Sequence, residues 1–395
     1  MSDQRFIEIM DSTLRDGEQT SGVSFLPHEK LMIARTLLRD LNVDRIEVAS
    51  ARVSDGEKEA VKMICRYAQQ INRLESVEVL GFVDGHTSVD WLDECGAKTL
   101  NLLAKGSLRH CTQQLHKTPE EHIADIKAVV SYAAEKGIGV NIYLEDWSGG
   151  MKDSPEYVYQ LMDALTIDHS PLTIDHSAAQ ENAESNNVQR SMVNGQCIKR
   201  FMLPDTLGIM NPLQVVEYFR KMVKRYPNTH FDFHAHNDYD LAVSNSLAAA
   251  LSGARGLHVT VNGLGERCGN APLSSVQVIL KDHFNALTSI NEEKLNDISR
   301  MVESYSGIAI APNQPIIGDN VFTQVAGVHA DGDQKGNLYH NALMPERFGR
   351  RRAYAMGKTS GRANIMRNLQ ELGLDLTPEQ MQRVTRRVTE LGDRK

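Results

Sequence analysis

Two histidines in the segment HFDFHAHND have the spacing needed to share one metal ion. Because side chains alternate along a β-strand, His234 and His236 project to one side and Ala235 to the other. A carboxylate, Asp16 in the segment STLRDGEQ, would complete a set of three ligands if the fold brought it to the same place. Such a set leaves coordination positions open for a substrate. For the HxH pattern alone, two unrelated polar residues are an equally good interpretation.

Other polar residues stand at the ends of segments that we predict to be strands. The segment NGLGERCGN carries three glycines, which would let backbone amides approach a ligand, although an ordinary tight turn also explains them. The polar positions near strand ends are Arg15, Glu145, Asp205, Thr206, Asn262 and Asn270. If the carboxyl ends of these strands meet at one face, as in an α/β barrel, these side chains converge on one site.

The elements that would position these residues alternate between β-rich runs and segments with helical spacing. Strands are predicted at residues 6–13, 45–49, 76–82, 98–103, 139–145, 198–205, 230–236 and 256–261. Helix starts are marked by a capping residue followed by proline, as at Thr118-Pro119 and Asn211-Pro212. Alternating strands and helices form a parallel sheet. We therefore predict the α/β class, as a (β/α)8 TIM barrel followed by a mainly helical C-terminal appendix.

We divide the chain into a TIM-barrel catalytic domain at residues 1–288 and a linker with a helical C-terminal subdomain at residues 289–395. One segment of the barrel, 165–196, departs from the alternation and contains two consecutive copies of LTIDHS. Its Ser-, Asn- and Gln-rich composition buries too little apolar surface to offset the entropy lost on ordering, so we predict a mobile insertion. In the appendix, a helix is predicted from Pro378 to Leu391.

The composition is that of a globular protein that works on small molecules. The chain has 395 residues, of which 41% are hydrophobic and 24% charged, and these values exclude a fibrous or wholly disordered chain. The formal net charge of -8 argues against a nucleic-acid partner or an anionic membrane. The sequence has neither a secretory segment nor an apolar run of about 18 residues. Five widely spaced cysteines without a CxxC pair indicate a reducing compartment, so we predict a cytoplasmic protein.

The segments STLRDGEQ, HAHNDYDLAVSNSL and NGLGERCGNAPL together resemble the acetyl-CoA-dependent condensing enzymes of the citramalate, 2-isopropylmalate and homocitrate synthase family. The resemblance runs from about Ile7 to the last residues, and LGFVDG, LNLLAKGS, LPDTLG and GVHADG look like the citramalate synthase branch. It implies an acyltransferase that condenses acetyl-CoA with a small 2-oxo acid, with pyruvate as the expected substrate and citramalate and CoA as the products. A 2-isopropylmalate synthase that uses 2-oxoisovalerate is the alternative.

A lyase is a further alternative, because HMG-CoA lyase-like enzymes share the barrel, the RDG and the HxH. These lyases use a cysteine in the glycine-rich loop after the eighth strand, where this chain has Cys268. The surrounding GERCGNAPL and the long appendix resemble the synthases instead, and Cys268 is expected to be a small packing residue. A catalytically inactive homologue is disfavoured, since no position expected to carry chemistry is substituted.

The resemblance also implies roles for residues at the barrel mouth. The ligands of a divalent metal ion, Mg, Mn or Zn, would be Asp16, His234 and His236, with Asn270 near the same sphere. Arg15 would add a fixed positive charge where alkoxide charge develops, and Thr206 would hold the substrate carboxylate. Without the two histidines, Arg15 and Asp16 would be interpreted as a simple salt bridge.

Condensation also requires a base that removes a proton from the acetyl-CoA methyl group. Glu145 is the first candidate, with a structural hydrogen-bond acceptor as the alternative for a lone strand-end glutamate. His329 in GVHADG and Tyr339 in GNLY resemble appendix residues that reach into the barrel of the partner subunit and assist proton transfer or thioester hydrolysis. This implies a homodimer with exchanged C-terminal subdomains. For His329 without its flanking match, an ordinary loop histidine would be the interpretation.

Three side chains are predicted to close the substrate pocket. Leu80, Leu103 and Tyr143 stand at inward-facing strand ends and match apolar positions of citramalate synthases. They should admit the methyl group of pyruvate and exclude the isopropyl group of 2-oxoisovalerate, although each methylene is worth only about 1–3 kcal/mol. Ordinary barrel packing is the alternative.

Regulation is predicted from the point at which the sequence stops. Full-length relatives usually continue into an α/β domain that binds the end-product amino acid, whereas this sequence ends at LGDRK. Allosteric coupling requires a second site. We therefore expect no inhibition by isoleucine or leucine.

Overall fold

The computed structural model describes residues 5–166, 191–193, 196–326, 328–329, 332, 335–336 and 338–394, with backbone only at 191–193 and 196–197. The chain forms two compact units. The first comprises Met1–Ile290 and Met301–Ile308, and the second comprises Asn291–Arg300 and Ala309–Lys395.

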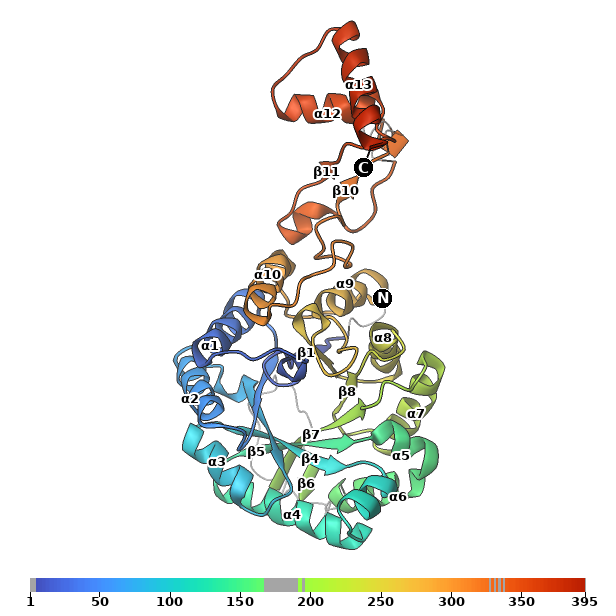
Figure 1. Cartoon of the computed structure of the whole chain (residues 1–395). Coiled ribbons are helices and arrows are strands. Elements are labelled where there is room, and N and C mark those ends of the chain that lie inside the picture. Colours follow the sequence, from blue (N-terminus) through green and yellow to red (C-terminus); the bar gives the residue numbers. More distant parts are fainter. Residues whose placement is uncertain are drawn as a thin grey trace, which may run out of the picture. The chain divides into compact units, whose positions relative to one another are not determined.

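The first unit is built around a closed barrel of eight parallel strands (Figure 1). The barrel strands are β1 (Glu8–Asp11), β2 (Arg45–Ser50), β3 (Val77–Phe82), β4 (Thr99–Lys105), β5 (Gly139–Glu145), β7 (Gln196–Asp205), β8 (Phe231–Ala235) and β9 (Gly256–Val259). They pair in the order β5-β4-β3-β2-β1-β9-β8-β7, and the pairing of β5 with β7 closes the barrel. The predicted TIM barrel is confirmed, and every predicted strand overlaps an observed one.

The ends of some strands differ from the prediction. Strand β4 continues to Lys105, two residues beyond its predicted end, and this extension places Lys105 opposite Glu145 of β5. A further strand, β6 (Ser191–Val193), was not predicted and pairs antiparallel with β7. Most of the predicted insertion at 165–196 lies outside the described residues. Within the described part, helix α6 (Pro155–Thr166) includes its first two residues.

Helices follow the strands and surround the barrel (Figure 1). Besides α6, they are α1 (Pro27–Arg35), α2 (Asp55–Gln70), α3 (Thr87–Cys95), α4 (Pro119–Glu135), α5 (Trp147–Asp153), α7 (Pro212–Arg225), α8 (Ala242–Ser252) and α9 (Leu273–Phe284). Short helical turns are η1 (Gly17–Gln19), η2 (Thr36–Leu41), η3 (Leu74–Ser76), η4 (His110–Gln114) and η5 (Val261–Gly263). Thr118 and Asn211 cap α4 and α7 with capping boxes, as their sequences predict. In the described part of the chain, no helix combines the length and apolarity needed to cross a membrane.

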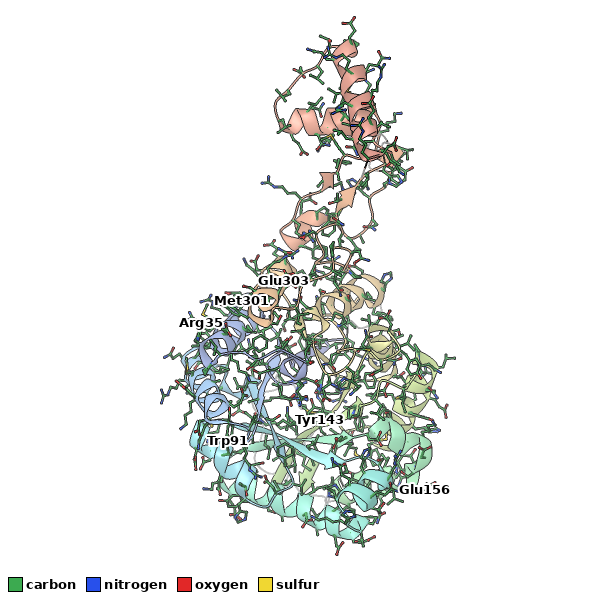
Figure 2. All side chains as sticks on the ribbon, viewed as in Figure 1. Arg35, Trp91, Tyr143, Glu156, Met301 and Glu303 are labelled. Atoms are coloured by element: carbon green, nitrogen blue, oxygen red, sulfur yellow. The ribbon has the colours of Figure 1, made fainter. Side chains whose placement is uncertain are left out.

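The barrel interior contains a chain of buried polar side chains. Arg45 pairs with Asp232 at 2.5 Å and with Glu78 at 3.0 Å. Asp232 also accepts a hydrogen bond from His258 Nε2 at 3.1 Å, and His258 Nδ1 lies 3.0 Å from Tyr143 Oη. Tyr143 lies within the ring of strands (Figure 2). Because a buried charge is costly unless it is paired, this network fixes the side chains beneath the barrel mouth.

The second unit contains short elements from the C-terminal part of the chain. They are η6 (Glu292–Lys294), the start of α10 (Leu295–Ser306), β10 (Thr323–Gln324), η7 (Pro345–Phe348), β11 (Ala353–Tyr354), α12 (Arg362–Glu371) and α13 (Pro378–Gly392). Strands β10 and β11 pair in parallel. Arg347 pairs with Glu292 at 2.6 Å, and Phe322 stacks on Phe348. Helix α13 agrees with the helix predicted from Pro378, whereas α12 and the two short strands were not predicted.

Candidate active site

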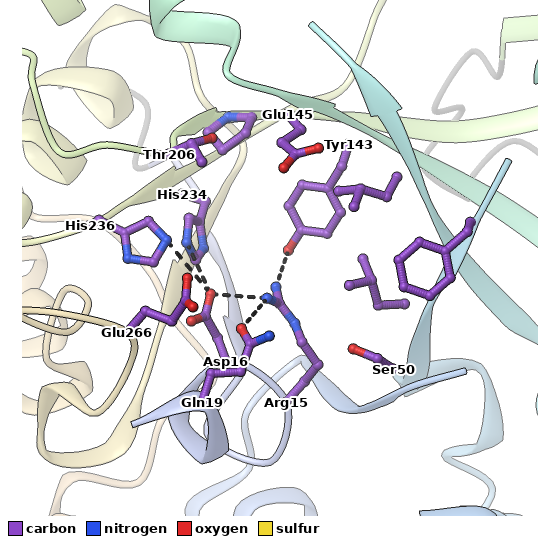
Figure 3. A pocket seen from close by; sticks show the side chains of 14 residues that line it. Arg15, Asp16, Gln19, Ser50, Tyr143, Glu145, Thr206, His234, His236 and Glu266 are labelled. Carbon is purple, nitrogen blue, oxygen red and sulfur yellow. Dashed lines mark hydrogen bonds and ion pairs between the residues drawn. The ribbon is translucent and has the colours of Figure 1, made fainter. Parts of the chain in front are cut away.

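Asp16, His234 and His236 meet at the C-terminal end of the barrel (Figure 3). His234 lies on β8, His236 directly follows this strand, and Asp16 directly precedes η1. The Oδ2 atom of Asp16 is 3.3 Å from His234 Nε2 and 3.9 Å from His236 Nε2. All three side chains are buried, and their potential ligand atoms lie within 4.8 Å of one another. The structure therefore brings together the three residues that the sequence indicates as metal ligands.

The protonation states of these residues suit a divalent cation. Burial lowers the pKa of His234 and His236 below the ordinary value, against the opposing effect of Asp16, so both imidazoles are neutral and able to act as ligands. Burial alone would raise the pKa of Asp16, but the positive charge of Arg15 beside it is the main cause that lowers this pKa to about 2. The carboxylate is therefore ionised at neutral pH.

Asn270 adds a fourth candidate ligand. It pairs with His236 through an isolated β-bridge, and its Nδ2 donates to the backbone oxygen of Leu264 at 3.0 Å. Its buried Oδ1 has no hydrogen-bond partner among the residues that the structure describes. A buried oxygen without a partner is costly unless something occupies the space before it. Two imidazoles, a carboxylate and an amide oxygen therefore fit Mg, Mn or Zn.

Arg15 connects the metal-ligand candidates to the barrel interior. Its Nη1 donates to Asp16 Oδ2 at 3.1 Å, its Nε donates to Glu47 Oε2 at 2.5 Å, and its Nη2 lies 3.5 Å from Tyr143 Oη. Glu47 is fully buried on β2 and also accepts hydrogen bonds from Ser12 Oγ at 2.8 Å and from Asn101 Nδ2 at 2.7 Å. The Arg15–Asp16 salt bridge, which was the alternative interpretation, is therefore present. It is part of a larger network of hydrogen bonds and ion pairs.

Glu47 was missed by the sequence analysis. The signal was available, since Glu47 is a charged residue within the otherwise apolar core of the predicted strand at residues 45–49, RIEVA. Charges are rare at such positions unless they have a partner.

A cavity of about 210 Å³ opens beside Asp16 and the two histidines. Leu80, Leu103 and Tyr143 form its apolar side, where Leu80 and Tyr143 pack with Met10 and Met202. The other lining residues are Arg15, Asp16, Gln19, Ser50, Phe82, Glu145, Pro204, Thr206, His234, His236 and Glu266. Pockets for drug-sized ligands measure about 300–1,000 Å³, so this cavity suits a smaller molecule.

Glu145 and Thr206 line the same cavity from β5 and from the end of β7 (Figure 3). Glu145 forms an ion pair with Lys105 of β4. Thr206 Oγ1 accepts a hydrogen bond from the backbone N–H of Asp146 at 2.9 Å, which leaves its hydroxyl hydrogen available to a ligand. Asp205, in contrast, accepts the N–H groups of the following turn and does not line the cavity.

The glycine-rich loop after β9 folds tightly around Asn270. Gly269 has a φ of 82°, and a Cβ atom there would lie 1.9 Å from the backbone oxygen of Gly263, so only glycine fits. Arg267 ties this loop to its neighbours by donating to Asp238 at 2.8 Å and to the backbone oxygen of Thr206 at 2.8 Å. Cys268, which was expected to be a small packing residue, has an exposed side chain in this loop.

The two predicted residues of the appendix lie together in the second unit. The rings of His329 and Tyr339 are 4.3 Å apart between centroids, and the Tyr339 side chain is 43% exposed. Their predicted action in the barrel of a partner chain stays a prediction.

Two family models match different parts of the chain. Residues 6–302 match the family model described as HMGL-like, and residues 316–395 match the model described as Homocitrate synthase post-HMGL domain-like. The (R)-citramalate synthase of Methanocaldococcus jannaschii is 34% identical over 388 residues, which cover 98% of this chain and 71% of that protein. The 2-isopropylmalate synthase of the same organism is 34% identical over 393 residues, or 98% and 68% of the two chains.

Among solved structures, an HMG-CoA lyase of Bacillus subtilis superposes with a TM-score of 0.59 and 21% identity, covering 78% of this chain and 97% of that chain. At this low identity, the similarity shows the shared barrel fold alone.

Proposed function

Because the chain belongs to the HMGL-like family, among relatives that include citramalate and 2-isopropylmalate synthases, we propose that it condenses acetyl-CoA with pyruvate to give citramalate and free CoA. The observation that carries the choice of pyruvate is the small cavity beside Asp16, His234 and His236. In this proposal its apolar side, formed by Leu80 and Leu103 with Tyr143, receives the methyl group of pyruvate. A 2-isopropylmalate synthase, which accepts a larger 2-oxo acid, is the second candidate.

In this proposal the 2-oxo acid lies between the polar and apolar sides of the cavity. A divalent metal ion held by Asp16, His234, His236 and Asn270 would supply Lewis-acid polarisation of the keto group. Thr206 donates its hydroxyl hydrogen to the substrate carboxylate, and the methyl group of pyruvate packs against Leu103.

Glu145 supplies the base. Its carboxylate takes a proton from the methyl group of acetyl-CoA, and the resulting carbanion attacks the keto carbon. Arg15, held in place by Asp16 and Glu47, stabilises the negative charge that develops on the former keto oxygen. This oxygen then takes up a proton, and Glu145 gives up the proton that it accepted. Water hydrolyses the thioester and releases CoA.

A panel of 2-oxo acids tests this function. The enzyme is supplied with acetyl-CoA and with pyruvate, 2-oxobutyrate, 2-oxoisovalerate or 2-oxoglutarate, and the released CoA thiol is measured. We expect the highest kcat/KM with pyruvate. A preference for 2-oxoisovalerate would replace the citramalate assignment by the 2-isopropylmalate one, and no release of CoA with any 2-oxo acid would overturn both.

The metal site has its own test. Because His234→Ala or His236→Ala removes one of the few protein ligands, each should reduce the Mn²⁺ bound in a titration and abolish condensation. His86→Ala, which removes an exposed histidine stacked on Tyr132, is the matched control and should bind metal like the wild type. Undiminished metal binding and turnover in both site variants would remove these histidines from the proposal.

We further propose that the active protein is a homodimer in which the second unit of one chain serves the barrel of the other. In support, the second unit exposes apolar side chains to solvent, including Val328, Leu338, Met356 and Leu372. His329 and Tyr339 belong to the same unit and would assist proton transfer or thioester hydrolysis. The free thiols of Cys65, Cys95, Cys111 and Cys268 favour the cytoplasm as its location.

A further inference from the structure

We propose that Lys105 is a further catalytic residue, whose ammonium group holds the thioester oxygen of acetyl-CoA while Glu145 removes the methyl proton. This inference rests on the proposed condensation and deepens it, because it assigns the part of the site that receives the second substrate.

The placement of Lys105 follows from strand register. It ends β4, and Glu145 ends β5 directly opposite. Residues in register on neighbouring parallel strands point to the same side of the sheet, and the Lys105 ammonium group forms an ion pair with Glu145 Oε2. Glu145 lines the substrate cavity. The ammonium group therefore lies beside the proposed base at the barrel mouth.

The backbone of Lys105 is held from two sides. Its N–H donates to His122 Nε2 at 3.0 Å, and its carbonyl oxygen accepts a hydrogen bond from Tyr157 Oη at 3.0 Å. His122 and Tyr157 are both buried. These two hydrogen bonds fix the backbone from which the Lys105 side chain extends, as the positioning of an active-site residue requires.

A second buried lysine shows how an ammonium group is satisfied when its role is structural. Lys30 Nζ is 2.6 Å from Glu18 and from Glu57, and it also donates to the backbone oxygens of Leu14 and Val48 at 2.9 and 3.3 Å. Lys105 is only 8% exposed, yet its Nζ has Glu145 as its one hydrogen-bond partner within the described ranges. An ammonium group has three donors, so Lys105 has donors left for a ligand.

Two arginines at the barrel mouth already have partners. Arg15 is held by Asp16 and Glu47, and Arg267 is held by Asp238 and the backbone oxygen of Thr206. Arg15 serves the 2-oxo acid in the proposed reaction. We therefore assign acetyl-CoA to Lys105, whose Nζ has only Glu145 as a partner within the described ranges, rather than to either arginine.

The chemistry of enolisation calls for such a donor. As Glu145 accepts the proton, the C–H electron pair forms the new C=C bond and the carbonyl π pair moves onto the thioester oxygen. This oxygen is bonded to the carbon next to the methyl carbon, so a donor that touches the same carboxylate is within reach of it. When the enolate carbon bonds to the keto carbon, the thioester carbonyl re-forms and the charge passes to the keto oxygen near Arg15. The keto oxygen then takes up a proton and Glu145 gives up the one that it accepted, so no oxidant or other reactant is needed.

The test compares Lys105→Met and Lys105→Arg with the wild type, with Lys117→Met as the control. Lys117 lies just before α4 and forms an ion pair with Asp125 of that helix. Lys117→Met therefore also removes an ion-paired lysine. Steady-state kinetics are measured with acetyl-CoA and with acetyl-CoA deuterated in its methyl group. Removal of a donor to a developing oxyanion lowers kcat by about 10²–10³-fold, and we expect this for Lys105→Met.

We also expect the deuterium isotope effect on kcat to rise in Lys105→Met, because proton removal becomes rate-limiting. The KM for pyruvate and the bound metal should stay as in the wild type, and Lys105→Arg should regain part of the lost rate. If Lys105→Met does not fold, Lys105→Gln carries the same comparison. A kcat close to the wild-type value, or a lower kcat without a larger isotope effect, would overturn the role of Lys105. Absence of CoA release in the wild type would instead overturn the proposed function.

Discussion

Arg15 contacts three groups at once, and these contacts limit which side chain can take its place. Its guanidinium contacts Asp16, Glu47 and Tyr143 from different edges, which a point charge on a flexible stem does not reproduce. We expect Arg15→Lys to fold normally and to lower kcat by about 10²–10³-fold, the usual cost of one lost oxyanion donor. The control is Arg52→Lys, since Arg52 forms an exposed pair with Asp84. A near-normal kcat in Arg15→Lys would remove this side chain from the mechanism.

Leu103 provides a second residue-scale test, since it packs beside Leu80 and Tyr143 at the apolar side of the cavity. Leu103→Ala should enlarge that side and raise kcat/KM for 2-oxoisovalerate relative to pyruvate. Discrimination of about 1–3 kcal/mol per methylene predicts a change in this ratio of roughly ten- to 200-fold. Leu213→Ala, at an 80% exposed position on α7, is the control and should leave the ratio unchanged. An unchanged ratio in Leu103→Ala would mean that other residues select the substrate.

Individual residues were predictable from the sequence where their chemistry shows in a local pattern. The HxH at the end of β8 and the RD after β1 identify candidate metal ligands by residue type and spacing, namely Asp16, His234 and His236. Lys105 and Glu47 carry no such pattern, because their importance depends on partners in other strands. Lys105 was also missed because its strand was predicted to end at residue 103, whereas hydrogen bonds to β5 extend it to the residue opposite Glu145. Register between strands is a property of the folded sheet.

At the scale of elements, α1 anchors the loop that carries Arg15 and Asp16. Lys30 of α1 is fully buried and joins Glu18, Glu57 and the backbone oxygens of Leu14 and Val48. Removing one partner of a buried ion pair leaves the other uncompensated. The loop before η1 therefore depends on a helix that contributes nothing to the cavity itself.

We expect Lys30→Met to lower the free energy of unfolding by about 3–5 kcal/mol, measured by urea denaturation. Lys199→Met is the control, because Lys199 pairs with the exposed Glu75 and such pairs contribute less than about 1 kcal/mol. If the two variants lost the same small amount of stability, the Lys30 cluster would not be anchoring the loop.

Elements were predicted well where the pattern repeats. Alternation of apolar runs with capped amphipathic helices led to the barrel, since a parallel sheet needs a helix between its strands. Strand β6 was missed because three residues that pair antiparallel with β7 carry too short a pattern of their own. The short strands β10 and β11 escaped prediction for the same reason.

At the scale of the whole molecule, both units combine a buried apolar core with apolar side chains that remain exposed. The barrel buries long runs of apolar strand residues beneath its helices. The second unit leaves Val328, Leu338, Met356 and Leu372 largely in solvent. Burial of such side chains against a partner stabilises a protein interface. A second copy of the chain is the partner in our proposal, and exchange of this unit would bring His329 and Tyr339 to a barrel that lacks them.

Subunit mixing tests this exchange. In the proposed dimer, His234→Ala would disable the barrel part of the site, and His329→Ala would disable the part contributed by the second unit. If the second unit serves the partner, a heterodimer of the two variants contains one site with an intact barrel and an intact second unit. Random reassortment of equal amounts makes half of the dimers heterodimers, so turnover should recover to about a quarter of the wild-type value. Two barrel variants, His234→Ala and Arg15→Lys, form the control mixture, in which neither barrel is intact and recovery is not expected. Recovery absent from both mixtures, although mass spectrometry detects the heterodimers, would show that each chain uses its own second unit.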